Sequence, residues 1–185
     1  MVSGAVEPEM LRFVDECGLH TSLAPICGYA PKGERLRLSV PRSRGKNTTL
    51  LSSMTIEGMG PSLAVEGATT ARVFETYDVE KALVPSLRTG QIVVMDNLGA
   101  HRPKRIGELI EQQGGCELLY LPAYSPDYNP IEEAFAKIEN LLRKAAARSK
   151  EALVEAIGQA LSAVTAADAW GFFEHAGYRP AGQLL

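Results

Sequence analysis

Carboxylates stand directly after apolar segments of this sequence, where they could take part in chemistry. Asp96 follows the apolar run 92–95, and Gly90 and Gly99 lie on either side of that segment. A short run of β-branched and long apolar residues between turn residues is typical of a buried strand. Because ligands of open α/β sheets lie at the carboxyl ends of the strands, Asp96 is placed where an acid can act.

The residues after Asp96 predict a helix and a second strand. Pro103 is well placed to open the helix, apolar residues follow at helical spacing, and Gly114 ends it. Residues 118–121 then form another apolar run. A strand–helix–strand unit returns the chain in the same direction, so we expect both strands to finish at one edge of the sheet.

A proline-rich loop after the second strand leads into a long amphipathic helix that begins with two acids. Asn129 is a suitable N-cap and Pro130 a suitable first helical residue. Glu132 therefore has a structural interpretation, as the capping-box partner of Asn129, beside a functional one. Helical periodicity leaves Glu132 and Glu133 on the flanks of the apolar stripe and does not choose between them. One of them should meet Asp96 in space.

A third acid ends another apolar run near the start of the chain. Residues 11–14 are followed by Asp15 and Glu16, and Gly18 closes the segment. A central position of this strand would put Asp15 beside Asp96; the alternative is that the two acids merely begin a turn. The remaining elements that the pattern predicts are strands at 36–40 and 48–56, with a turn at 57–58, and helices at 68–87, 150–164 and 166–176.

Asp15, Asp96 and Glu132 would together form an oxygen-only site, because no His or Cys stands near them at ligand spacing. Mg²⁺ and Mn²⁺ select such sites, and carboxylates so close raise one another's pKa unless a cation neutralises them. Two cations about 3.5–4 Å apart could activate a water or a 3′-hydroxyl for in-line attack on a phosphodiester. The sequence therefore predicts a metal site.

Composition limits the class of protein. With 185 residues and 45% hydrophobic content, we expect one domain spanning residues 1–185. The three cysteines show no metal-ligand spacing, which favours a reduced, cytoplasmic protein. Because no apolar run approaches the roughly 18 residues of a membrane span and no apolar run follows a basic start, we expect neither a membrane span nor an export signal.

The net charge of −3 conceals a basic stretch. Six basic residues stand against the single Glu34 in this stretch: Lys32, Arg35, Arg37, Arg42, Arg44 and Lys46. Such a segment is a plausible phosphate-contacting surface, and the alternative is a solvated hairpin.

Three motifs surround the second and third acids. They are Val94-Met95-Asp96-Asn97 with His101 four residues after Asn97, Leu121-Pro122 followed by Tyr124-Ser125-Pro126-Asp127, and Asn129-Pro130-Ile131-Glu132. Over residues 15–178 the chain resembles the catalytic core of the DDE transposases of the bacterial insertion-sequence branch of the mariner superfamily.

This resemblance implies an α/β, ribonuclease H-like fold, with a mixed five-stranded sheet (an antiparallel meander followed by parallel strands) flanked by helices. It implies Mg²⁺- or Mn²⁺-dependent DNA strand cleavage and strand transfer, with Asp15, Asp96 and Glu132 as catalytic and metal-binding residues. Asn97 and His101 match motif positions and take supporting roles. The expected partners are transposon ends, TA target DNA and a second copy in a homodimer, in the bacterial nucleoid.

Members of this family carry helix-turn-helix modules ahead of the catalytic core, and 185 residues leave no room for them. We therefore expect a catalytic domain without the N-terminal recognition region, which a separate chain could supply. Two alternatives stay open: another ribonuclease H-like nuclease, and an inactive remnant that acts as a DNA-binding or assembly module.

Overall fold

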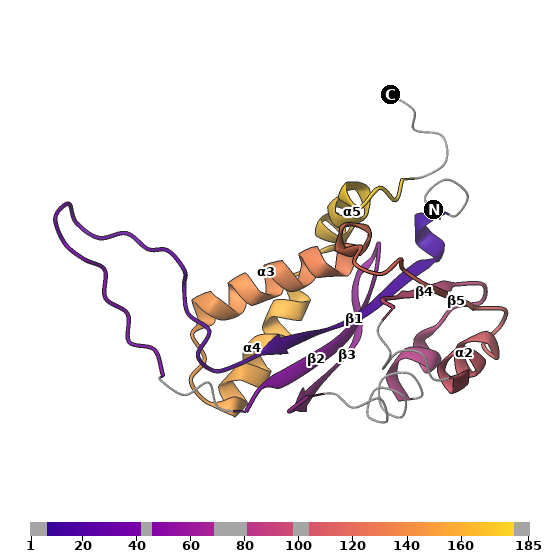
Figure 1. Ribbon diagram of the computed structural model, residues 1–185, viewed down its shortest axis with the longest axis horizontal. Coiled ribbons are helices and arrows are strands. Elements are labelled where there is room, and N and C mark those ends of the chain that lie inside the picture. Colours follow the sequence, from indigo (N-terminus) through magenta and orange to yellow (C-terminus); the bar gives the residue numbers. More distant parts are fainter. Residues whose placement is uncertain (1–6, 42–45, 69–80, 98–103, 180–185) are drawn as a thin grey trace.

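A computed structural model describes residues 7–41, 46–68, 81–97 and 104–179 (Figure 1). The strands are β1 (Leu11–Leu19), β2 (Thr48–Thr55), β3 (Gly58–Glu66), β4 (Ile92–Met95) and β5 (Glu117–Tyr120). The helices are α2 (Lys104–Glu111), α3 (Pro130–Ala145), α4 (Lys150–Ser162) and α5 (Ala166–His175). Short 3₁₀ turns cover Pro8–Met10, Val84–Ser86 and Pro126–Tyr128.

The strands form one five-stranded sheet in the order β3-β2-β1-β4-β5. β1, β2 and β3 are an antiparallel meander, while β4 pairs with β1 and β5 pairs with β4 in parallel. The mixed sheet expected from the sequence is therefore confirmed. Helix α2 provides the crossover from β4 to β5, which keeps the two strands parallel, as the spacing of apolar residues predicts.

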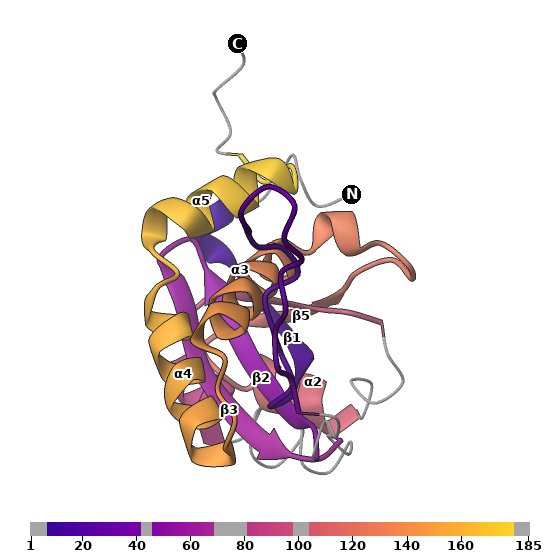
Figure 2. The same cartoon turned by 90° about the vertical axis from the view of Figure 1, so that its left-hand side faces the viewer.

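The strand expected at residues 36–40 is wrong. Every residue of 25–41, which we call the arm, is exposed, and none of them is in a strand. The arm extends away from the sheet (Figures 1 and 2). Alternating apolar and polar residues form a strand only where a neighbouring strand supplies hydrogen-bond partners. The arm lies away from the sheet and pairs with none of its strands.

The strand that completes the meander is β3, which the sequence pattern missed. Gly58 and Gly60 look like turn residues, but Gly58 begins β3 with a φ of 123°, a conformation that favours glycine. The turn itself lies at Ile56 and Glu57. β1 also differs from its expected length: it continues beyond Asp15 to Leu19, because residues as far as Leu19 still pair with β2.

The helices agree more closely with the sequence pattern than the strands do. Helices α2, α3, α4 and α5 lie where periodicity places them. Of the helix expected at 68–87, residues 69–80 fall outside the described part of the chain, and helical turns at 81–86 end beside Pro85. Pro103 also lies outside the described residues.

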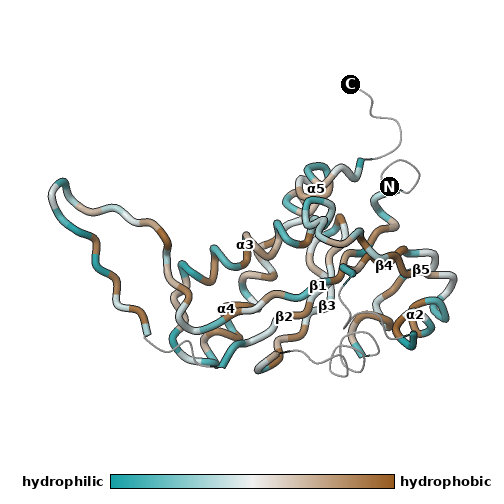
Figure 3. The backbone as a smooth tube through the Cα atoms, in the orientation of Figure 1, coloured by the Kyte–Doolittle hydropathy of each residue, from teal (hydrophilic) through white to brown (hydrophobic). Residues whose placement is uncertain are grey.

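Two apolar cores form, one on each face of the sheet. Leu11 and Phe13 of β1 pack with Phe173 and other residues of α3, α4 and α5. Val14 of β1 instead packs with Ile106 of α2. Hydrophobic residues accordingly lie along the strands and the inner helix faces in Figure 3, whereas the tip of the arm is hydrophilic. Successive residues of a strand thus have fixed and opposite surroundings.

Phe173 anchors α5 in the larger core. It is fully buried, and its ring packs edge-on against Phe13 at a centroid distance of 5.3 Å. Phe173→Ala should lower the free energy of unfolding by about 3–5 kcal/mol, because it removes buried area and leaves a cavity. Urea denaturation measures the change. Val154→Ala, at a side chain 47% exposed, is the control and should change stability by no more than about 0.5 kcal/mol. Equal effects would contradict this packing.

Candidate functional site

Two acids are brought together by the parallel pairing of β1 and β4. Val14 lies opposite Met95 in this register, so Asp15 and Asp96 occupy the next positions on adjacent strands. Because Phe13 and Val94 belong to the core under α3, the alternation of strand residues puts both acids on that same face. Asp15 is only 5% exposed, whereas Asp96 keeps partial access to solvent. The sequence-based placement of Asp15 beside Asp96 is confirmed.

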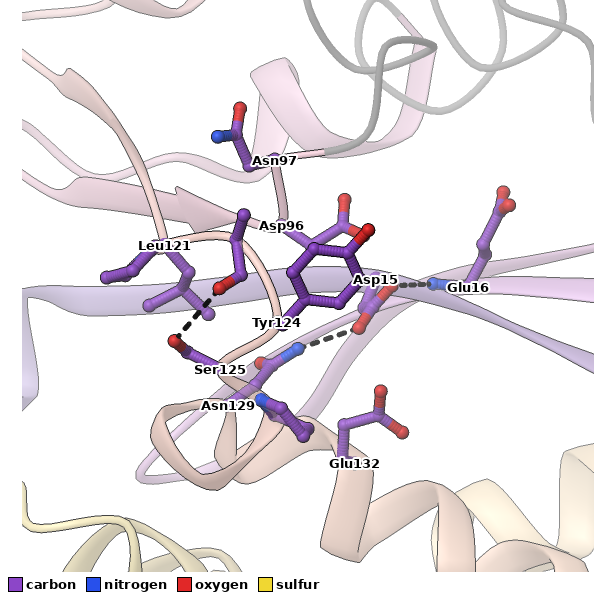
Figure 4. A pocket seen from close by; sticks show the side chains of 12 residues that line it. Asp15, Glu16, Asp96, Asn97, Leu121, Tyr124, Ser125, Asn129 and Glu132 are labelled. Atoms are coloured by element: carbon purple, nitrogen blue, oxygen red, sulfur yellow. Dashed lines mark hydrogen bonds between the residues drawn. The ribbon is translucent and has the colours of Figure 1, made fainter.

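Glu132 reaches the same place from the first turn of α3. Asp15, Asp96 and Glu132 all line one cavity of about 490 Å³, together with Asn97 and Asn129. Figure 4 shows the side chains of Asp15, Asp96, Asn129 and Glu132 gathered between the ends of the central strands and the start of α3, with the Asn97 side chain turned away from them. Three acids that are far apart in the sequence therefore share one pocket.

The neighbouring acid of α3, Glu133, does not line this pocket. Its Oε1 lies 2.5 Å from Nδ1 of His175 on α5. Asp127, Glu133 and His175 line a separate cavity of about 410 Å³, which Glu132 also borders. The structure thus separates the two glutamates that helical periodicity left equivalent.

The Asp15 carboxylate is buried and held by two hydrogen bonds. The backbone N–H of Glu16 donates to Oδ1 and the side-chain amide of Asn129 donates to Oδ2, each at 2.7 Å. Burial, and then the charges of Glu132 and Asp96, raise the pKa of Asp15 to about 7, although the two hydrogen bonds act to lower it. An ionised Asp15 is therefore costly in this pocket without a compensating cation.

The ionised form of Glu132 is also disfavoured in this pocket. Its side chain keeps access to solvent, yet desolvation by the surrounding protein, and then the charge of Asp96, raise its pKa. The donor set of the pocket is oxygen only, which suits Mg²⁺ or Mn²⁺, and crowded carboxylates are what such a cation neutralises. As they stand, the side chains of residues 7–41, 46–68, 81–97 and 104–179 include no group of three or more His, Cys, Asp or Glu residues arranged to hold a metal ion. Metal binding by the three acids stays a prediction.

Among the lining residues for which the sequence predicted no role in the site, Asn129 and Tyr124 stand out by their geometry. Asn129 does not cap α3 with its side chain, contrary to the expected N-cap, because that side chain bonds to Asp15. The sequence shows that Asn129 lies three residues before Glu132, but it does not predict the hydrogen bond to Asp15. Tyr124, fully exposed beside the pocket, adopts a left-handed φ of 59°, which costs free energy for a residue with a Cβ. No sequence signal predicts that conformation.

The predicted supporting and DNA-binding residues do not all lie at the acid pocket. Asn97 lines the acid pocket, while His101, Arg42 and Arg44 lie outside the described residues. Three of the predicted DNA-contacting residues are exposed on the arm: Lys32, Arg35 and Arg37.

Lys46 lies near the start of β2, beside two basic residues from the α3–α4 region. Lys46 bonds to Glu66 at 2.8 Å, and Lys150 bonds to the other oxygen of the same carboxylate. Together with Arg148 they line a cleft of about 310 Å³. Three cations against one carboxylate leave this cleft positively charged, close to the base of the arm.

A helix that crosses a bilayer must be both long and apolar. None of them in the described part of the chain is both long and apolar enough to cross a membrane.

The family follows from comparison with known proteins. A family model described as DDE superfamily endonuclease matches residues 10–154, so the chain belongs to this family, whose members are typically metal-dependent nucleases. No curated protein sequence matches the chain.

Solved structures share the fold. The catalytic domain of Mos1 mariner transposase superposes with a TM-score of 0.66 at 18% identity, over 92% of this chain and 78% of that one. A Mos1 paired-end complex with the left transposon end gives 0.73 at 19% identity, over 91% and 52%. A Mos1 paired-end complex with Mn gives 0.71 at 20%, over 92% and 53%. The chain thus spans about half the length of the Mos1 chains in these complexes, and the expected ribonuclease H-like fold is confirmed.

The contact of Glu133 with His175 can be checked by titration. Glu133 raises the pKa of His175, with Asp127 as a weaker contributor. The stabilisation is present below the ordinary pKa of histidine and is lost as pH rises through the higher pKa of the folded state. An NMR titration should therefore show a raised pKa for His175 that Glu133→Gln brings back toward its ordinary value. Glu132→Gln is the matched control and should leave the His175 titration unchanged; the reverse result would mean that the two glutamates have been exchanged.

Proposed function

We propose that this chain is the catalytic domain of a transposase of the bacterial insertion-sequence branch of the mariner superfamily, which cleaves DNA and transfers the cut strand. The observation that carries the proposal is the convergence of Asp15, Asp96 and Glu132 on one pocket in a chain of the DDE family. Their oxygen-only chemistry and the raised pKa values of Asp15 and Glu132 support it.

The three acids are the proposed ligands of Mg²⁺ or Mn²⁺, with two ions in the working site. The Mos1 complex with Mn, which has the same fold, supports this choice of metal. When bound, the cations would favour deprotonation of the attacking group and neutralise charge on the leaving oxygen. Asp15 contributes a carboxylate whose orientation is already fixed, while Asp96 and Glu132 border it from β4 and α3.

The proposed reactions are two successive phosphoryl transfers. In cleavage, a water oxygen bonds to phosphorus and the P–O3′ bond breaks, so that the products are a 3′-hydroxyl and a 5′-phosphate. In strand transfer, that 3′-hydroxyl replaces water and attacks a target phosphodiester, which releases the target's own 3′-hydroxyl. No oxidant or external energy source is needed, because one phosphodiester is exchanged for another in the second step.

The partners we propose are transposon-end DNA, a TA target and a second copy of the chain. The Mos1 paired-end complex supports two ends handled together. The exposed arm and the basic cleft supply positive charge suited to phosphates, which gives affinity without sequence information. Selection of the transposon ends would then require base contacts from a helix-turn-helix module outside residues 1–185.

Cleavage tests the catalytic proposal. Asp96→Asn keeps the size of the side chain but removes its charge, so Mg²⁺- or Mn²⁺-dependent nicking of duplex DNA should fall at least about 100-fold, the scale on which a lost stabilising group acts in catalysis. A plasmid-nicking assay measures the rate. Glu108→Gln, at an exposed acid of α2, is the control and should cleave as the unaltered chain does.

Three results, from this assay and from matched measurements on RNA–DNA hybrids and of metal binding, would count against the proposal. Equal activity of Asp96→Asn would exclude the acid pocket as the site of cleavage. Faster cleavage of RNA–DNA hybrids than of DNA duplexes would favour another ribonuclease H-like nuclease. Absence of both metal binding and cleavage, even with a helix-turn-helix partner added, would favour an inactive remnant.

The arm should contribute to DNA affinity through its charge. Each phosphate contact contributes about −0.9 to the slope of log K against log salt, so about five contacts give a slope near −4.5. The Arg35→Gln/Arg37→Gln double variant should make the slope less steep by about 1.8 and weaken binding equally for all sequences. Fluorescence anisotropy at several salt concentrations measures this. Arg88→Gln/Lys104→Gln is the matched control, and an equal change in both double variants would exclude a specific role of the arm.

A further inference from the structure

Asn129 stands between the buried acid of β1 and the acid of α3. Its side-chain amide donates to Oδ2 of Asp15 at 2.7 Å, and its backbone carbonyl accepts the N–H of Glu132 at 3.1 Å. One residue therefore contacts two of the three acids, as Figure 4 shows for its side chain. We propose that Asn129 is a positioning residue, which holds the Asp15 carboxylate in the orientation that divalent-cation binding requires. This inference rests on the proposed function.

Asn129 bonds to Asp15 instead of capping the helix that it precedes. Asn129 precedes Pro130 at the start of α3, where an Asn side chain commonly caps the helix, yet it makes no cap hydrogen bond. It is only 5% exposed, and the bond it makes instead spans 114 residues of the chain. The Asn129 side chain thus bonds to Asp15 in place of the cap bond that its position favours.

The Asn129 amide also leaves Asp15 able to bind a cation. A carboxylate has about four lone-pair positions, of which the Glu16 N–H and the Asn129 amide occupy one on each oxygen. Both oxygens therefore keep an acceptor position for a metal. An amide N–H₂ is neutral and only donates, so it fixes the carboxylate without competing for the cation. A lysine or arginine here would bring a positive charge that repels it.

The backbone around Asn129 is itself fixed. Its N–H donates to the carbonyl of Pro126 at 2.8 Å, and the ring of Pro130 restricts the backbone of the preceding residue, Asn129. The 3₁₀ turn Pro126–Tyr128, whose C-cap is Asn129, thus fixes the position of that residue relative to α3. The Tyr178 hydroxyl donates to the carbonyl of Tyr128 at 2.8 Å, which ties this turn to the C-terminal core.

The test measures Mn²⁺ binding to the full chain by isothermal titration calorimetry. Asn129→Ala should weaken Mn²⁺ binding about 10- to 100-fold, the range found when a hydrogen-bond partner of a metal ligand is removed. Asn129→Ser is the second variant: serine is a good N-cap and supports α3, but its side chain is too short to replace the amide. Asn140→Ala, at an exposed asparagine of the same helix, is the matched control and should bind as the unaltered chain does.

Thermal melts and saturating metal separate positioning from folding. Asn129→Ser should melt within a few degrees of the unaltered chain while still binding Mn²⁺ weakly. Its cleavage rate should recover at high Mn²⁺, whereas that of Asp15→Asn should not, because only the latter lacks the ligand itself. A further readout needs no variant of Asn129: its side-chain amide protons should exchange slowly in the unaltered chain and rapidly in Asp15→Ala.

The outcomes distinguish this inference from the function on which it rests. If the unaltered chain binds Mn²⁺ and both Asn129 variants bind it equally well, the positioning role is overturned and the catalytic proposal stands. Rapid exchange of the Asn129 amide protons in the unaltered chain would likewise overturn the positioning role alone. If the unaltered chain and Asp15→Asn both fail to bind Mn²⁺, the proposed function fails, and this inference fails with it.

Discussion

The parallel pairing of β1 with β4 is the interaction on which the acid pocket depends. Its register puts Asp15 and Asp96 on neighbouring strands at equivalent positions, and a shift of one residue would turn one of them to the α2 face. That register is in turn fixed by alternating burial, since Phe13 and Val94 enter one core while Val14 and Val93 enter the other. Packing on both faces thus determines which acids can meet.

This arrangement concentrates negative charge in a place that disfavours it. Asp15 is nearly inaccessible, and its raised pKa reflects burial first and the neighbouring acids next. A site that served only stability would have no reason to gather three carboxylates in one pocket when one of them is buried. The neutral donors around Asp15 reduce this cost in part, and a divalent cation is the partner whose charge and oxygen preference match what is left.

Much of this could be predicted from the sequence, because it depends on local pattern. The strands around the acids, the helices and the pairing of Asp15 with Asp96 follow from apolar periodicity and from the direction of a strand–helix–strand unit. Three features could not be predicted in this way. The arm has the alternation of a strand but no pairing partner, β3 begins with glycines that look like a turn, and the choice of Glu132 over Glu133 depends on His175 of a distant helix.

Asn129 shows why long-range contacts cannot be predicted from local sequence pattern. From its neighbours alone the residue is a good N-cap, and that local preference is sound, since Pro130 and the helix follow as expected. In the folded chain the Asn129 side-chain amide donates instead to Asp15, a carboxylate with little access to water and therefore a strong acceptor, and its oxygen makes no cap bond. The N–H groups at the start of the helix have the charges of Glu132 and Glu133 nearby to favour them. Competition between a local and a long-range hydrogen bond is decided by burial and charge, and these exist only once the chain has folded.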